Sequence, residues 1–157
     1  MDNSSDIIEI VPFSADYIDD MYAIETQSFS VPWSKQDILK DALENKLAIY
    51  IVALLNKKVA GYMGLWHVVT EGHITNIAVD PFFRGKGIGQ KLLSRAIEIA
   101  EEKEMIGLTL EVRMNNTPAQ RLYTKNGFMV EGLRKNYYSD TKEDALIMWR
   151  KIDNPYC

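Results

Sequence analysis

The sequence predicts a mixed α/β (α+β) fold, and three observations support this prediction. Apolar runs of strand length alternate with segments of helical periodicity along all 157 residues. The expected order is strand, two helices, three strands, helix, strand, helix and two strands, which is typical of a sheet covered by helices. No linker, repeat or low-complexity tract divides the chain. We therefore expect one domain that spans residues 1–157.

The first third of the chain is expected to hold one strand and two helices. The stretch "DIIEIVPF", residues 6–13, alternates enough to form the first strand. Ser14 is a suitable cap for a helix over Asp16–Gln27. The stretch "SVPWS" then interrupts the helical pattern, and its final residue, Ser34, can cap a second helix that runs through Leu43.

The middle of the chain is expected to form three strands and a long helix. "LAIYIVALL" and "VAGYMGLWHVV" are two apolar runs separated by "NKK", which indicates a hairpin. "HITNIAV" follows after an expected turn at "TEG", residues 70–72. From Gly87 to Lys103 the apolar residues recur at helical spacing, and this set consists of Ile88, Leu92, Ala96, Ile99 and Ala100.

The last third is expected to contain a strand, a short helix and a hairpin. "IGLTLEV" has the composition of a buried strand. Thr117–Lys125 is expected to be a helix that Asn126 and Gly127 close. The runs "FMVEGLRKNYY" and "DALIMWRKI" then predict two final antiparallel strands.

The composition is that of a soluble globular protein, with 46% hydrophobic and 25% charged residues. The formal net charge of -4 disfavours general nucleic-acid binding. The longest apolar run, Leu47–Leu55, is far shorter than the ~20 residues that cross a membrane, and the acidic start of the chain does not resemble a secretory signal. We therefore expect a cytoplasmic protein without membrane association, and we favour a monomer.

Cysteine and histidine are scarce. Cys157 is the only cysteine, so an internal disulfide framework is excluded and a thiol nucleophile is disfavoured. His67 and His73 are the only histidines. With so few nitrogen and sulfur ligands, we expect no metal site.

The stretch "DPFFRGKGIGQKLL", residues 80–93, has glycine at every second position from Gly85 to Gly89. The spacing fits neither the dinucleotide fingerprint G-x-G-x-x-G nor the nucleotide-binding loop G-x-x-x-x-G-K-[ST]. Bare amides that lead into a helix N-terminus, with Arg84 and Lys86 nearby, can bind a phosphate or pyrophosphate. A tight strand-to-helix turn, in which glycine only relieves strain, explains the same stretch equally well.

Two residues in "LTLEVRMNNTPAQRLYTKNGF" are candidates for acid–base chemistry. Glu111 falls near the end of a buried strand, where a carboxylate needs a partner or a use. Tyr123 follows twelve residues later on the next helix. The structural alternatives are an ion pair from Glu111 to Arg113 or Arg134, and a packing role for Tyr123 with its hydroxyl satisfied.

Taken together, these motifs resemble those of the GNAT acetyltransferase superfamily. "RGKGIG" is similar to its acyl-CoA loop, R/Q-x-x-G-x-G/A, and "NNTPAQRLYTKNGF" to its segment N-x-x-A-x-x-x-Y-x-x-x-G-F. The order of elements also matches over nearly the whole chain. "FSVPWS", "NIAVDP", "LEVRMNN" and "NYYSDTKEDALIMW" resemble the bacterial ribosomal-protein alanine N-acetyltransferases within that superfamily. The resemblance implies a central, mostly antiparallel mixed sheet whose strands splay at a cofactor cleft.

The resemblance implies acetyl-CoA as cosubstrate. It assigns Glu111 as the general base, acting through water with a pKa raised by burial, and Tyr123 as the general acid toward the coenzyme A thiolate. The Val79 amide would polarise the thioester. Contacts with the cofactor are assigned to Ile77, Ala78, Val79, Arg84, Gly85, Lys86, Gly87, Ile88, Gly89, Gln90 and Asn116.

The resemblance also implies an acceptor. Direct transfer to the N-terminal α-amine of a protein is expected, the acceptor being a small-subunit ribosomal protein with N-terminal alanine. The alternatives are an enzyme that acetylates a lysine side chain or a small amine, and a non-catalytic acyl-CoA-binding subunit. Residues expected to border the acceptor are Phe29, Pro32, Trp33, Tyr137 and Tyr138, although bulky aromatic residues are more often packing residues.

Overall fold

The computed structural model describes residues 5–153, so Cys157 lies outside the described residues. The strands are β1 (Ile8–Pro12), β2 (Ala48–Leu55), β3 (Lys58–Val68), β4 (Glu71–Val79), β5 (Gly107–Arg113), β6 (Met129–Arg134) and β7 (Ala145–Lys151). The helices are α1 (Ile18–Ser28), α2 (Lys35–Glu44), α3 (Ile88–Glu102) and α4 (Thr117–Lys125), with short 3-10 turns at η1 (Ala15–Tyr17) and η2 (Pro81–Phe83). This is the predicted order of strands and α-helices. Among residues 5–153, no helix is both long and apolar enough to cross a membrane.

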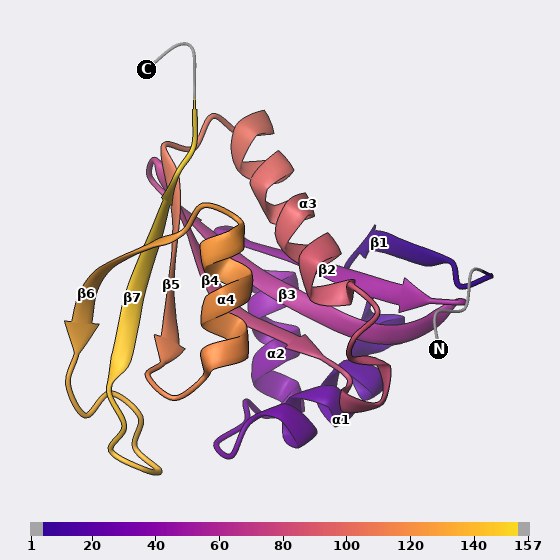
Figure 1. The fold of residues 1–157 in the computed structure, drawn as a ribbon. Helices are drawn as coiled ribbons and strands as arrows, with labels where there is room; N and C mark the ends of the chain where they lie inside the picture. Colours follow the sequence, from indigo (N-terminus) through magenta and orange to yellow (C-terminus); the bar gives the residue numbers. More distant parts are fainter. Residues whose placement is uncertain (1–4, 154–157) are drawn as a thin grey trace.

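The seven strands form one open sheet in the order β1-β2-β3-β4-β5-β7-β6. Every neighbouring pair is antiparallel except β4 and β5, which are parallel. Figure 1 shows β1 at one edge of the sheet and β6 at the other. The expected mixed, mostly antiparallel sheet is therefore confirmed.

Two helical layers cover the sheet, one on each face (Figure 1). On one face, α3 and α4 pack on a core that includes Leu92, Leu110 and Phe128. On the other, α1 and α2 pack on a second core around Met21, Ile38 and Tyr62. The apolar residues predicted for the long helix are all buried in the first core, so the periodicity of that segment identified its buried face correctly.

Local signals set most of the element boundaries. Ser14 Oγ accepts a hydrogen bond from the Asp16 amide, but the first turn after it is 3-10 and the α-helix begins only at Ile18. Ser34 caps α2 as expected, because its Oγ accepts a bond from the Asp37 amide. Gly127 ends α4 with a left-handed φ of 88°.

The turn predicted at residues 70–72 begins one residue earlier and ends two residues earlier in the structure. Val68 and Glu71 are paired in the β3–β4 ladder, so the turn consists of Val69 and Thr70 alone. Val69 takes a φ of 56° to make this turn. The extended ladder draws Glu71 and Gly72 into β4, which turn composition alone did not indicate.

Candidate active site

A cleft opens where β4 and β5 separate. The two strands pair only between Glu71–His73 and Gly107–Thr109. Beyond that short parallel ladder they diverge, and a cavity of about 610 Å³ is lined by residues of both strands, α1, α4 and two loops. The expected splay is therefore present, and it opens a passage between the two faces of the sheet.

The cleft brings together residues that are far apart in the sequence. The predicted site residues that line it are Phe29, Trp33, Ile77, Glu111, Asn116, Tyr123, Tyr137 and Tyr138. Pro32 does not line this cleft. It borders a separate groove of about 690 Å³ beside α2, and Trp33 borders both cavities. The expected contact of Pro32 with an acceptor in the cleft is therefore not supported by the geometry.

The glycine-rich loop ends in an exposed helix N-terminus. Gly85 and Gly87 take φ values of 81° and 80°, which a residue with a Cβ adopts only with strain. The first intrahelical bond of α3 is donated by the Lys91 amide to the Gly87 carbonyl. The amides of residues 88–90 therefore lack intrahelical acceptors and carry the positive end of the helix dipole. This is the geometry of an anion site.

Some side chains of this loop already form ion pairs or hydrogen bonds with other residues of the protein. Lys86 Nζ lies 2.9 Å from Asp6 Oδ2. Gln90 exchanges two side-chain hydrogen bonds with Asn126, at 2.7 and 2.9 Å, and so joins α3 to α4. Gln90 is thus suited to contact an anion by its backbone amide, while Arg84 is exposed beside the loop.

The edge of β4 that faces the split presents backbone groups from alternate residues. The Asp80 amide bonds to the Ala60 carbonyl on β3. Because successive residues of a strand direct their backbone groups to opposite sides, Ala78 also faces β3, whereas Ile77 and Val79 face the split. The expectation for Ala78 is therefore corrected, since its N–H and C=O belong to the β3 side.

Glu111 lies on the opposite face of β5 from the core residues Leu110 and Val112. His73 Nε2 is 2.8 Å from Glu111 Oε2, and Arg134 Nε is 3.5 Å from Oε1. The hydrogen bond with His73 is the largest influence and lowers the pKa of Glu111; burial acts in the opposite direction, and the Arg134 charge lowers it further. The expected rise in pKa is therefore wrong in sign, because burial is only partial and is outweighed.

Tyr123 is placed on α4, on the face opposite Glu111. Only 6% of the residue is exposed, and its ring packs against Phe128 with centroids 5.8 Å apart. Burial raises the pKa of the phenol well above its usual range. The hydroxyl therefore stays protonated at neutral pH. Because both residues line the same cleft, the split in the sheet joins a carboxylate on one face to a proton donor on the other.

Asn116 begins α4 at the edge of the cleft. Its Oδ1 accepts a hydrogen bond from the Ala119 amide at 3.2 Å and so caps the helix. Pro118 lies in the first turn, where its missing N–H is tolerated. The cap holds the Asn116 side chain at the cleft with its amide nitrogen as a donor.

Sequence reasoning missed two titratable residues of the site, His73 and Glu25. Glu25 is only 2% exposed, lines the cleft, and accepts hydrogen bonds from the Trp33 amide at 3.0 Å and from the Tyr62 hydroxyl. Burial is the largest influence and raises its pKa. A signal was available, because Glu25 follows Met21 by four residues and shares its buried helix face. No local pattern could place His73 beside Glu111, 38 residues away.

Comparisons with known proteins agree with this geometry. Residues 18–128 match the acetyltransferase (GNAT) family. A Bacillus subtilis protein, provisionally named a ribosomal protein bS18-alanine N-acetyltransferase, is 47% identical over 87% of this chain and 90% of its own length. The Escherichia coli K12 ribosomal protein bS18-alanine N-acetyltransferase is 36% identical over 81% of this chain and 86% of its own.

The solved structures agree as well. The crystal structure of the ribosomal-protein-S18-alanine N-acetyltransferase from Escherichia coli superposes with a TM-score of 0.86, at 31% identity, over 94% of this chain and 95% of that one. The resemblance drawn from the sequence motifs is thus confirmed. The chain belongs to the GNAT acetyltransferase family and is an acetyl-CoA-dependent N-acetyltransferase.

Proposed function

We propose that this enzyme acetylates the N-terminal α-amine of a ribosomal protein that begins with alanine, an acceptor of the bS18 type. The relatives named for this reaction support the acceptor class. The observation that carries the chemistry is that Glu111 and Tyr123, on opposite faces of the sheet, meet in one cleft beside the open edge of β4. A cofactor on one face and an acceptor on the other can therefore react through the split.

The residues present fit acetyl-CoA, which supplies the acetyl thioester. The amides of residues 88–90 suit its pyrophosphate, and the outward backbone groups of Ile77 and Val79 can pair with an extended pantetheine arm as an added strand does. Asn116 can donate its side-chain N–H groups to the same arm. The helices α3 and α4 lie on the face that carries Tyr123, and β4 is the strand at the edge of the split.

Glu111 serves the acceptor amine. A free α-amine has a pKa of ~7.7–8.0, so much of it is protonated at neutral pH. A carboxylate whose pKa is lowered is a weak base for that ammonium group. The nitrogen becomes far more acidic once it has attacked the thioester, and Glu111, through water, is then basic enough to take the proton. The hydrogen bond with His73 lowers the pKa of the carboxylate and orients it for this step.

Val79 and Tyr123 serve the acyl group. The Val79 amide, directed into the split, can donate to the thioester oxygen as negative charge develops on it. The Tyr123 hydroxyl, which is protonated at neutral pH, can transfer its proton to the departing thiolate. Acetyl transfer is then direct, so that the C–S bond breaks as the new amide forms.

The walls of the cleft on the acceptor side are aromatic. Phe29 and Trp33 line it from the α1–α2 loop, and Tyr137 and Tyr138 line it from the β6–β7 loop. The two tyrosine rings meet edge to face, with centroids 5.1 Å apart. Such walls can pack against an apolar first side chain and the backbone that follows it, and the choice of alanine rests on the named relatives.

The acceptor is tested with acetyl-CoA and a panel of peptides that differ only at the first residue, with a lysine-containing peptide whose N-terminus is blocked as control. We expect the alanine peptide to have the highest kcat/KM and the control to be poorly acetylated. Acetylation of the lysine control alone would replace the α-amine by a side-chain amine. Binding of acetyl-CoA with no transfer to any amine would instead identify a non-catalytic subunit.

A further inference from the structure

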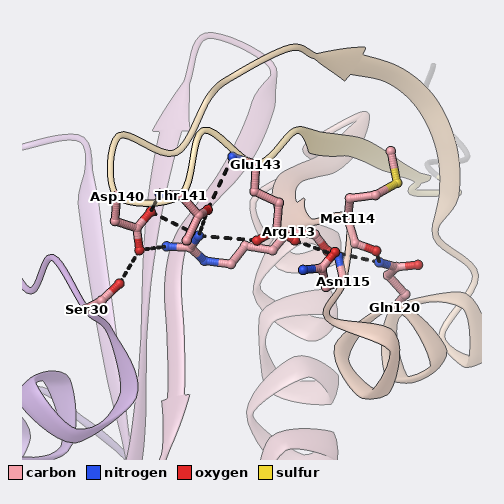
Figure 2. Close-up of polar contacts among 8 residues, drawn as sticks. All are labelled: Ser30, Arg113, Met114, Asn115, Gln120, Asp140, Thr141 and Glu143. Carbon is pink, nitrogen blue, oxygen red and sulfur yellow. Dashed lines mark hydrogen bonds and ion pairs between the residues drawn. The ribbon is translucent and has the colours of Figure 1, made fainter.

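Arg113, at the end of β5, is held in a dense polar network (Figure 2). Its guanidinium forms a bidentate pair with Asp140, with Nη1 3.2 Å from Oδ1 and Nη2 3.0 Å from Oδ2. Nη1 is also 3.5 Å from Glu143 Oε1. The guanidinium carbon lies 3.9 Å from the centroid of the Tyr138 ring. Through these contacts with Tyr138, Asp140 and Glu143, Arg113 holds the β6–β7 loop, residues 135–144, against the end of β5.

The same network anchors the backbone that carries Arg113. The Gln120 side-chain amide donates to the Arg113 and Met114 carbonyls, at 2.9 and 2.8 Å. Glu143 Oε2 accepts a bond of 2.7 Å from the Asn115 amide. Because β5, α4 and the β6–β7 loop are joined by these bonds, Arg113 is a rigid support rather than a mobile surface side chain.

Asp140 extends this support to the other loop of the cleft. Its Oδ2 accepts a hydrogen bond from the Ser30 hydroxyl, on the α1–α2 loop 110 residues away in sequence. Figure 2 shows Asp140 between Ser30 on one side and Arg113 on the other. Its Oδ1 also accepts a bond from the Thr141 amide. Both carboxylate oxygens are thus engaged by the protein, which makes Asp140 poorly suited to bind a cationic group of an acceptor.

This contact links the two walls of the acceptor side. Ser30 directly follows Phe29, and Asp140 follows Tyr138 by two residues, while Phe29, Tyr138 and Asp140 all line the cleft. A bond between Ser30 and Asp140 therefore limits how far the aromatic walls can separate. An acceptor N-terminus places backbone on one side of its reacting amine. An internal lysine carries backbone in both directions from its side chain, so it needs a wider opening between the two loops.

We propose that Ser30, Arg113 and Asp140 form a bridge across the acceptor side of the cleft that admits a chain N-terminus and rejects an internal lysine. Ser30 and Asp140 span the gap, and Arg113 is the positioning residue that holds Asp140 and Tyr138. The inference rests on the proposed function and adds to it the residues that determine the choice between the two kinds of amine.

The test compares kcat/KM for an alanine-terminated peptide with kcat/KM for an N-terminally blocked peptide that contains an internal lysine. In Ser30→Ala the ratio of the two values should fall about fivefold, because a hydrogen bond to a charged group is lost. Thr26→Ala is the control and should leave the ratio unchanged, because it removes an exposed hydroxyl from α1 that bonds to the Ala23 carbonyl and does not line the cleft. In an Asp140→Ala background, Ser30→Ala should have no further effect.

Acetyl-CoA affinity and Tm are measured for each variant. In Ser30→Ala the affinity should match the parent and Tm should fall by only about 2–4 °C, which separates a change of selectivity from a loss of folding. A parent enzyme that prefers the alanine peptide, with an unchanged ratio in Ser30→Ala, would overturn the bridge alone. A parent enzyme that prefers the lysine peptide would overturn the proposed function and the bridge together.

Discussion

The proposed cofactor side and the proposed acceptor side of the cleft are formed by different kinds of groups. On the cofactor side, the groups suited to the ligand are backbone amides of residues 88–90 and of Val79, supported by the regular elements α3 and β4. On the acceptor side, the walls are side chains on two loops, and their arrangement depends on contacts such as Ser30 with Asp140. The cofactor side is thus fixed by secondary structure and the acceptor side by long-range side-chain contacts.

The difference explains how one fold can keep its cosubstrate while its acceptor changes. Backbone amides are present whatever the side chain, so substitutions alter the cofactor side little unless they change the backbone path. Loop side chains can change without disturbing the sheet. Glu111 lies at the boundary, because it is on β5 but its carboxylate is bonded by His73 on β4, which lowers its pKa. Substitutions on the two sides should therefore affect different kinetic constants.

The largest effect is expected at that boundary. Glu111→Gln should lower kcat by roughly 10²–10³-fold, since general base catalysis contributes effects of that size, while the Kd of acetyl-CoA should change little. Steady-state kinetics with an alanine-terminated peptide and equilibrium binding of acetyl-CoA measure the two quantities. Equal losses in turnover and in cofactor affinity would place Glu111 on the cofactor side and break the comparison.

The pH dependence sharpens this test. Because the pKa of Glu111 is lowered, the carboxylate is already ionised wherever the acceptor amine begins to lose its proton. In both the parent and Glu111→Gln, kcat/KM should then rise with pH around the amine pKa of ~7.7–8.0, with the same midpoint and a lower plateau in the variant. A midpoint that moves when Glu111 is removed would assign the transition to the carboxyl group instead.

An intermediate effect is expected in the glycine-rich loop. Gly87→Ala places a Cβ on a backbone with a φ of 80°, which costs about 1–2 kcal/mol and should weaken acetyl-CoA binding by about tenfold, because the amides of α3 move. Gly89→Ala is the matched control. Its φ is not left-handed, and an added Cβ would meet Leu122 Cδ2 at an ordinary 3.4 Å. Thermal unfolding and binding isotherms should show a loss in the first variant and little change in the second.

The smallest effect is expected at Asp6, whose carboxylate pairs with Lys86 beside the proposed anion site. Asp6 pairs with Lys86, and its negative charge lies near the expected pyrophosphate position. Asp6→Asn should lower the Kd of acetyl-CoA by roughly two- to threefold at low salt and less at high salt, because the pair is screened. Glu9→Gln, which removes the exposed pair with Lys57, is the control. A weaker affinity in Asp6→Asn would mean that the pair supports the loop.

The features of the fold and the site that depend on nearby residues could be predicted from the sequence, and those that depend on long-range contacts could not. The order of elements, the caps at Ser34 and Gly127 and the buried face of α3 could be predicted because they depend on residues within one or two turns. The position of the β3–β4 turn could not, since the ladder between Val68 and Glu71 decided it. Glu111 could be singled out as a buried carboxylate, but the direction of its pKa shift depended on a histidine 38 residues away.

By itself, the sequence determined the elements, the glycine turn into α3 and the residue types available for acid–base chemistry, because propensity, capping and periodicity act over short distances. Only the tertiary structure decided that β4 and β5 part after His73, that Ala78 faces β3 rather than the cleft, and that Arg113 holds Asp140 against Ser30. Those features depend on strand register and on side chains that meet across the fold, which no local pattern records.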